Sequence, residues 1–172
     1  MKYAMLKVGA PSDIAFDIET SVSFDGDSGP YLQYTYARCR SVLRKAKNSS
    51  IGDLGTVGDA SLNPEERALA RLINYFPEIV AQAASQLAPN VLCTYLFRLA
   101  QAFNLFYAKH QILGTQDLGL RTQDVGLGTR FSPTSYVIRP MSASLRLSLT
   151  AATAQVLKNG LYLLGIETLE QM

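Results

Sequence analysis

Five basic side chains cluster in one short stretch of the sequence, and two tyrosines precede them. The stretch from residue 31 to residue 47 has no acidic residue, and its first tyrosines are Tyr31 and Tyr34. Its basic residues are Arg38, Arg40, Arg44, Lys45 and Lys47. Cationic side chains bind phosphates and tyrosine rings stack on unpaired bases, so the combination is typical of a surface that binds single-stranded RNA. Composition alone favours a simpler interpretation, a solvated helix face with cations near its C-terminal end.

Another tyrosine, Tyr107, lies in a long apolar segment, residues 90–112. It falls outside the apolar residues that recur there at helical spacing, which are Leu92, Leu96, Leu99, Phe103 and Phe106. On a helix, Tyr107 shares its face with Asn104 and Gln111. These polar neighbours predict an exposed ring that the core does not need.

Residues for catalysis are scarce. His110 is the only histidine, which excludes a zinc site with two histidine ligands. Its position is that of a residue at the C-terminal end of a helix, where the helix dipole favours histidine. Cys39 and Cys93 lack the spacing of a cysteine-rich metal site and fit buried thiols in a reducing compartment. No glycine-rich phosphate-binding motif occurs. We therefore predict no catalytic residue and no metal site, and a binding module in place of a complete enzyme.

The composition limits the size of the fold and its partners. The 172 residues are 48% hydrophobic and 17% charged, which is enough apolar material for one domain with a core. The formal net charge is only +2, so binding of nucleic acid must depend on a local patch. No stretch is apolar over the length of a membrane span, and the first residues lack a signal-peptide pattern. We expect no membrane partner.

The segments that must position these residues show the spacing of apolar side chains that is typical of helices. In the stretch from residue 31 to residue 47, apolar side chains repeat every three or four residues, and Asn63 before Pro64 marks a helix start. The pattern of residues 13–24 fits either a helix or a strand. We predict an all-α bundle of about five or six helices, with helical segments at residues 1–8, 31–47, 64–76, 77–87, 90–112 and 142–164.

A glycine-rich segment separates the last two of these helices. The heptamer at residues 115–121 is nearly repeated at residues 122–128, without helical period. Such a tandem repeat is typical of a flexible insertion, here at about residues 114–140. We expect a single domain, residues 1–172, that carries this insertion.

Several short motifs occur in an order that is specific to one family. They are Phe16-Asp17, Gly26-Asp27-Ser28-Gly29-Pro30-Tyr31-Leu32-Gln33-Tyr34, Ala37-Arg38, Asn159-Gly160, Leu163-Leu164-Gly165-Ile166 and the terminal Met172. With them the sequence resembles the C-terminal anticodon-binding domain of class I arginyl-tRNA synthetases, which are arginine–tRNA ligases. The resemblance covers almost the whole chain except residues 49–61 and 113–141.

The resemblance implies roles near the anticodon loop of arginine tRNA. Tyr107 matches an aromatic residue that packs against anticodon-loop nucleotides, and Met172 matches a terminal residue close to the same site. Gly26, Asp27 and Ser28 match a loop that responds to anticodon binding. The implied partners are arginine tRNA and the catalytic domain of the same synthetase, in the cytoplasm, and not DNA.

The catalytic signatures of this family are missing from the sequence. Its His-x-Gly-His motif for ATP needs two histidines, and its flexible lysine loop is also absent. The expectation is an excised C-terminal domain that is inactive alone and has no cofactor of its own, whereas the parent enzyme would use ATP, with magnesium, and arginine. The alternative is a helical-bundle protein-interaction module that has lost RNA binding. The basic patch and the exposed tyrosine favour RNA, because a protein-docking face is expected to be apolar.

Overall fold

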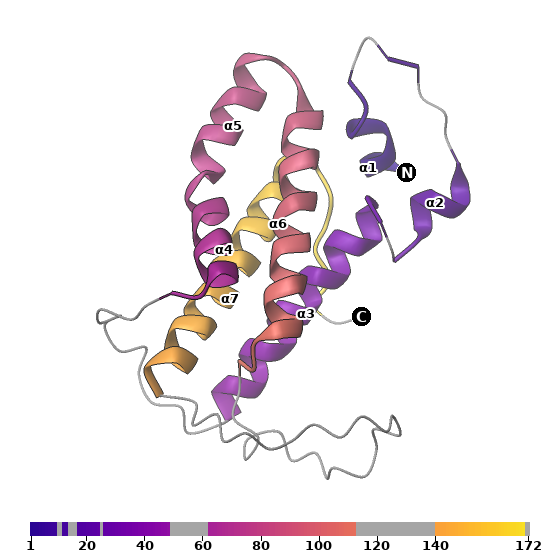
Figure 1. Ribbon diagram of the computed structural model, residues 1–172. Coiled ribbons are helices and arrows are strands. Elements are labelled where there is room, and N and C mark those ends of the chain that lie inside the picture. Colours follow the sequence, from indigo (N-terminus) through magenta and orange to yellow (C-terminus); the bar gives the residue numbers. More distant parts are fainter. Residues whose placement is uncertain (10–11, 14–16, 25, 49–61, 113–139, 171–172) are drawn as a thin grey trace.

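The computed structural model describes residues 1–9, 12–13, 17–24, 26–48, 62–112 and 140–170. Throughout these ranges the regular structure is helical, so the prediction of an all-α bundle is confirmed. Two helices of five residues precede five longer ones (Figure 1). The helices are α1 (Lys2–Leu6), α2 (Ile18–Val22), α3 (Gly29–Asn48), α4 (Pro64–Asn74), α5 (Phe76–Ser85), α6 (Pro89–Lys109) and α7 (Pro140–Leu163).

Two predicted features fall on other parts of the chain. The predicted insertion at residues 114–140 lies outside the described residues, except for Pro140, with which α7 begins. The segment 49–61, which the family resemblance does not cover, also lies outside them.

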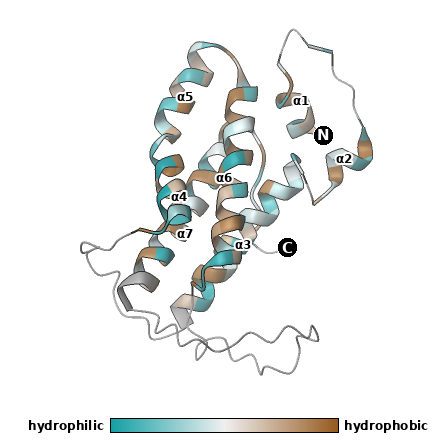
Figure 2. Ribbon diagram, viewed as in Figure 1, coloured by the Kyte–Doolittle hydropathy of each residue, from teal (hydrophilic) through white to brown (hydrophobic). Residues whose placement is uncertain are grey.

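The central helix of the bundle is α6, which contacts each of α3, α4, α5 and α7. Its predicted apolar stripe is buried, with Leu96, Leu99, Phe103 and Phe106 inaccessible to solvent. The matching stripe of α3 packs against the same core, and both free cysteines, on α3 and α6, are buried in it. Figure 2 shows hydrophobic and hydrophilic residues alternating along the helices, as amphipathic helices around one core require.

Helices α6 and α7 pack closely against each other at Gly160. A Cβ atom at this position would lie 2.5 Å from Cδ2 of Leu96, well inside any real carbon–carbon contact. The glycine in the predicted Asn159-Gly160 motif is therefore required by helix packing. Larger residues here would force the two helices apart.

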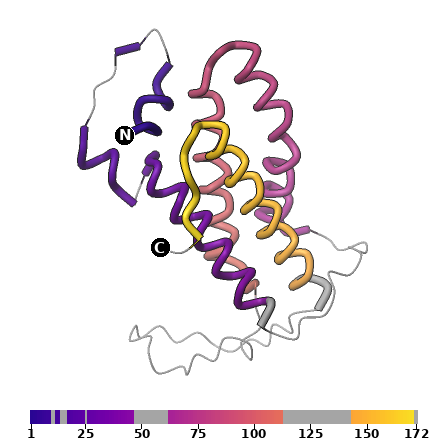
Figure 3. The backbone as a smooth tube through the Cα atoms, turned by 180° about the vertical axis from the view of Figure 1, so that it is seen from behind, coloured from indigo at the N-terminus to yellow at the C-terminus, as the bar shows by residue number. Residues whose placement is uncertain are grey.

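The residues after α7 run back along α3 (Figure 3). Gln33 donates from Nε2 to the carbonyl oxygen of Glu167 at 2.7 Å, and Lys2 donates from Nζ to that of Gly165 at 2.6 Å. Gly165 has φ of +66°, a left-handed conformation that glycine adopts without strain at the end of a helix. These residues, 164–170, form the C-terminal tail, which thus ties the N-terminal helix to the beginning of α3.

Candidate nucleic-acid interface

Tyr34 and Arg38 of α3 and Tyr107 of α6 form one group on the surface, which we call the aromatic–arginine cluster. The guanidinium carbon of Arg38 lies 4.6 Å from the centre of the Tyr34 ring and 5.2 Å from that of Tyr107. Both distances fit cation–π contacts. Tyr34 is 39% exposed and Tyr107 is 42% exposed, so each ring keeps a solvent-accessible surface. The predicted exposure of Tyr107 is confirmed.

Asn104 of α6 holds the guanidinium of Arg38 in place. Arg38 donates from Nη1 to Oδ1 of Asn104 at 2.8 Å and from Nη2 to the Tyr34 hydroxyl at 2.8 Å. The Asn104 amide nitrogen donates to the hydroxyls of Tyr31 at 2.9 Å and Thr35 at 3.2 Å. Because these partners are neutral, they fix the position of the guanidinium without cancelling its charge.

Further aromatic rings pack against the cluster on its buried side and extend it along the surface. The Tyr31 ring packs edge-on against Phe97 at 5.7 Å between centres, so this half-buried tyrosine supports Asn104. Tyr107 leans on buried Phe103 at 6.1 Å. Phe24, which is 54% exposed, meets the Tyr34 ring edge-on at 6.3 Å. The exposed aromatic surface therefore extends from α6 across α3 to the end of the segment after α2.

The predicted loop Gly26-Asp27-Ser28 positions the start of α3. Gly26 is exposed and has φ of +79°, which glycine tolerates best. Asp27 accepts a hydrogen bond from the Tyr3 hydroxyl at 2.5 Å, and its carbonyl oxygen accepts one from Nζ of Lys7 at 2.8 Å. Ser28 is buried and caps α3, because its Oγ accepts from the backbone N–H of Tyr31 at 3.2 Å. Of these three residues, Gly26 alone is exposed.

The predicted basic stretch divides between two faces of α3. Arg38 belongs to the aromatic–arginine cluster, whereas Arg40 donates from Nε to Oε2 of Glu170 in the tail at 2.7 Å. The other carboxylate oxygen of Glu170 accepts from the Tyr36 hydroxyl at 2.7 Å. The hydrogen bonds from Tyr36 and Arg40 lower the pKa of Glu170. The side chain of Arg40 therefore binds the C-terminal tail.

The remaining predicted residues lie on the last turns of α3 or among the residues that the structure does not describe. Arg44 and Lys45 are exposed on the last two turns of α3. The side chain of Lys47 and the whole of Met172 lie outside the described residues. The structure therefore brings together Tyr31, Tyr34, Arg38 and Tyr107, and leaves Arg44 and Lys45 farther along the same helix.

A second polar group joins the start of α4 to the end of α6 and to α7. Glu65 accepts from Nζ of Lys109 at 2.6 Å and lies 3.3 Å from Nε2 of His110. The hydrogen bond from Lys109, the Glu65 backbone N–H and His110 lower the pKa of Glu65 to about 2. The only histidine of the sequence therefore lies beside the Glu65 carboxylate, next to the ion pair of Glu65 with Lys109 that joins two helices.

Next to it, buried Glu66 and partly buried Arg146 form an ion pair. Arg146 donates from Nε to Oε1 of Glu66 at 2.8 Å and from Nη1 to the carbonyl oxygen of Gln111 at 2.8 Å. The other Glu66 oxygen accepts from the N–H of Asn63 at 2.9 Å, as the predicted helix start requires. Burial alone would raise the pKa of Glu66, but the hydrogen bonds from Arg146 and Asn63 bring it below its ordinary value.

Among the described residues no group of three histidine, cysteine, aspartate or glutamate side chains is arranged to hold a metal ion. The ATP and magnesium that the family resemblance implies are expected in the parent enzyme, outside this chain. The described helices also include none that could cross a membrane.

Sequence reasoning missed Asn104 and Glu170 as supports of this region. Asn104 was noticed only as a polar neighbour of Tyr107, although an amide within an apolar helix signals a hydrogen-bonding partner. Glu170 gave no local signal, because its partners lie 130 or more positions away in the sequence.

Comparisons with known proteins point to a single family. The sequence model described as "DALR anticodon binding domain" matches residues 32–123 and 136–172. The chain is 35% identical over 170 residues to an arginine–tRNA ligase of Clostridium perfringens and 33% identical over 177 residues to one of Pyrococcus furiosus. These matches cover 99% and 100% of this chain, but only 26% and 24% of the two relatives.

A solved structure agrees with these sequence matches. The arginyl-tRNA synthetase of Thermus thermophilus superposes with a TM-score of 0.73 at 34% sequence identity. The match covers 99% of this chain and 26% of the synthetase. The chain thus spans about a quarter of the length of the proteins it resembles.

Proposed function

Because the chain belongs to the DALR anticodon-binding domain family, we propose that it binds the anticodon loop of arginine tRNA. The observation that carries the proposal is the aromatic–arginine cluster, in which two exposed tyrosine rings flank a guanidinium. Unstacked bases of an RNA loop are recognised by stacking on such rings and by hydrogen bonds to their edges. A charged donor held between the rings supplies such hydrogen bonds.

Each residue of the interface has a separate part in this proposal. Tyr34 and Tyr107 stack on loop bases, and Arg38 donates to a base edge or a phosphate from N–H groups not used in its bonds to Tyr34 and Asn104. Tyr31 supports Asn104, and Gly26, Asp27 and Ser28 set the start of α3. Arg44 and Lys45 contact phosphates farther along the loop. Met172 is assigned to the same site on the family resemblance alone.

The proposal extends to the protein of which this chain is one domain. We propose that residues 1–172 form the tRNA-reading domain of a cytoplasmic arginine–tRNA ligase and contact the catalytic domain of that enzyme. The catalytic domain would attach arginine to the tRNA with ATP and magnesium. The isolated chain is expected to be inactive, since its sequence lacks the ATP-binding signature.

Substitutions of Tyr107 test the proposal. Tyr107→Ala should weaken binding to arginine tRNA roughly tenfold to a hundredfold, because a lost base–aromatic stack costs about 1–3 kcal/mol. Tyr107→Phe should keep most of the affinity. The melting temperature should change little, since the ring is 42% exposed.

Tyr162→Ala is the matched control, because Tyr162 on α7 is 80% exposed and lies outside the cluster. Titration of each variant with arginine tRNA and with an unrelated tRNA measures both affinity and discrimination. Equal binding of the two tRNAs by the wild type, or an unchanged affinity of Tyr107→Ala, would contradict the proposal.

A further inference from the structure

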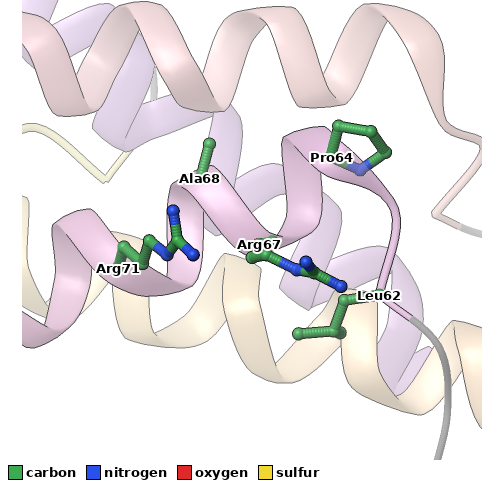
Figure 4. Close-up of a pocket in the computed structure, with 5 residues that line it drawn as sticks. All are labelled: Leu62, Pro64, Arg67, Ala68 and Arg71. Atoms are coloured by element: carbon green, nitrogen blue, oxygen red, sulfur yellow. The ribbon is translucent and has the colours of Figure 1, made fainter.

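A second cationic surface lies on α4, away from the aromatic–arginine cluster. Arg67 and Arg71 are both exposed and stand one helical turn apart. They line a shallow pocket of about 320 Å³ together with Leu62, Pro64 and Ala68. Figure 4 shows both guanidinium groups on the pocket side of α4, with that of Arg67 directed toward Leu62.

The acidic residues closest in sequence to this arginine pair are engaged elsewhere. Glu65 is bound to Lys109 and His110, and Glu66 is bound to Arg146 and the N–H of Asn63. Within the described part of the chain, neither Arg67 nor Arg71 forms an ion pair or a side-chain hydrogen bond. Among the described residues, the carboxylates of the first turn of α4 thus do not neutralise the positive charge of Arg67 and Arg71.

Two neighbouring positive charges lower the stability of α4 and favour the binding of an anionic ligand. Like charges four residues apart repel each other and cost a helix some stability. Two guanidinium forks that share one pocket can together grip phosphate oxygens, which arginine binds in bidentate geometry. The apolar side chains of Leu62, Pro64 and Ala68 line the pocket without supplying an acidic competitor.

The arginine pair and the aromatic–arginine cluster lie on helices that meet near one end of the bundle. The contact between Glu65 and Lys109 joins the first turn of α4 to the last turn of α6. Tyr107 lies two residues before Lys109 on that same turn. In Figures 1 and 3, α4 and α3 flank α6 on opposite sides. One end of the bundle therefore presents the two cationic surfaces on either side of α6.

We propose that Arg67 and Arg71 form a second phosphate-binding site that holds the RNA backbone flanking the loop bound by the aromatic–arginine cluster. This inference rests on the proposed function for the identity of the RNA. The arginine pair contributes affinity without reading sequence, because phosphate contacts carry no base information. Its contribution therefore extends to any RNA hairpin.

The salt dependence of RNA binding tests the second site. Arg67→Gln and Arg71→Gln should each lower the slope of log Kd against log salt concentration by about 0.7–0.9, and the double variant by about 1.4–1.8. Between 50 and 200 mM salt, the double variant should then lose roughly tenfold less affinity than the wild type. Arg98→Gln is the control, because it removes one exposed charge from α6.

Two RNAs separate this inference from the proposed function. The binding of arginine tRNA and of an unrelated RNA hairpin is measured for every variant, with thermal melts to confirm folding. Lower slopes on both RNAs for the α4 variants alone support the second site. Slopes equal to that of Arg98→Gln overturn it and leave the proposed function intact.

The wild-type measurements distinguish the remaining outcomes. Equal affinity of the wild type for both RNAs contradicts the proposed function, while the hairpin slopes still report on Arg67 and Arg71. Absence of binding to either RNA contradicts both.

Discussion

Arg38 and Arg146 are both arginines that join one helix of the bundle to another, but their partners differ in kind. Arg146 of α7 is paired with the buried carboxylate of Glu66 on α4. Arg38 of α3 contacts the amide of Asn104, the hydroxyl of Tyr34 and two aromatic rings. Among the described residues, no carboxylate forms an ion pair with Arg38. The charge of Arg146 is thus neutralised within the fold, whereas that of Arg38 is not.

The difference explains why one arginine stabilises and the other is available for a ligand. A buried pair is held by mutual neutralisation, so removing either partner leaves an uncompensated charge in the core. Amide and aromatic partners instead fix the direction of a guanidinium while contributing only modestly to stability. A preorganised but uncompensated arginine suits an RNA surface, because less side-chain freedom is lost on binding.

The largest effect is expected from breaking the pair between Glu66 and Arg146. Glu66→Gln should lower the free energy of unfolding by about 3–5 kcal/mol, because Arg146 is left without its counter-charge. The glutamine can still accept from the N–H of Asn63, so the helix start is preserved. Chemical denaturation of the two proteins measures the loss.

A second variant distinguishes lost charge pairing from lost packing. The double variant Glu66→Gln/Arg146→Met removes both charges and should recover much of the lost stability. A loss below about 1 kcal/mol in Glu66→Gln would contradict the structural role assigned to the pair.

A smaller effect is expected at Glu65, the half-buried neighbour of this pair. The pKa of Glu65 lies at about 2 in the folded protein, below its ordinary value of 4.5, mainly because of Lys109. A carboxylate with a lowered folded-state pKa contributes stability above its unfolded pKa and loses it as the pH falls through the folded value. This contribution should therefore disappear between about pH 4.5 and pH 2.

NMR titration of the Glu65 carboxyl carbon in Lys109→Gln checks the assignment. The apparent pKa should move upward toward 4.5 relative to the wild type, and Arg98→Gln should leave it unchanged. A wild-type Glu65 that titrates near 4.5 would show that the contact with Lys109 is not maintained in solution.

The sequence predicted the parts of this comparison that depend on local spacing. Tyr34 and Arg38 are four residues apart, which places them on one face of any helix, and Tyr107 falls off the apolar stripe of its helix. The start of α4 at Asn63 was also predictable from adjacent residues. The family resemblance is confirmed by the match over residues 32–123 and 136–172.

Partners distant in sequence could not be predicted in this way. The bond between Arg38 and Asn104 spans 66 positions and the one between Glu66 and Arg146 spans 80. Only the packing of α3 and α4 against α6 and α7 determines which polar side chains come into contact. For the same reason the five basic residues looked like one patch, although Arg40 is bound to Glu170. The pattern of residues 13–24 fits either a helix or a strand, because α2 has only five residues, too few to show a helical period.

A side-by-side measurement of Arg38→Gln and Arg146→Gln tests the contrast between the two arginines most directly. Arg38→Gln should weaken binding of arginine tRNA roughly tenfold to a hundredfold, the value of a charge-assisted hydrogen bond, and change the melting temperature by only a few degrees. Arg146→Gln should lower the melting temperature by roughly 6–20 °C and leave the affinity of the folded protein unchanged. The contrary result, a destabilised Arg38→Gln with full affinity beside a stable Arg146→Gln with weak affinity, would contradict the account.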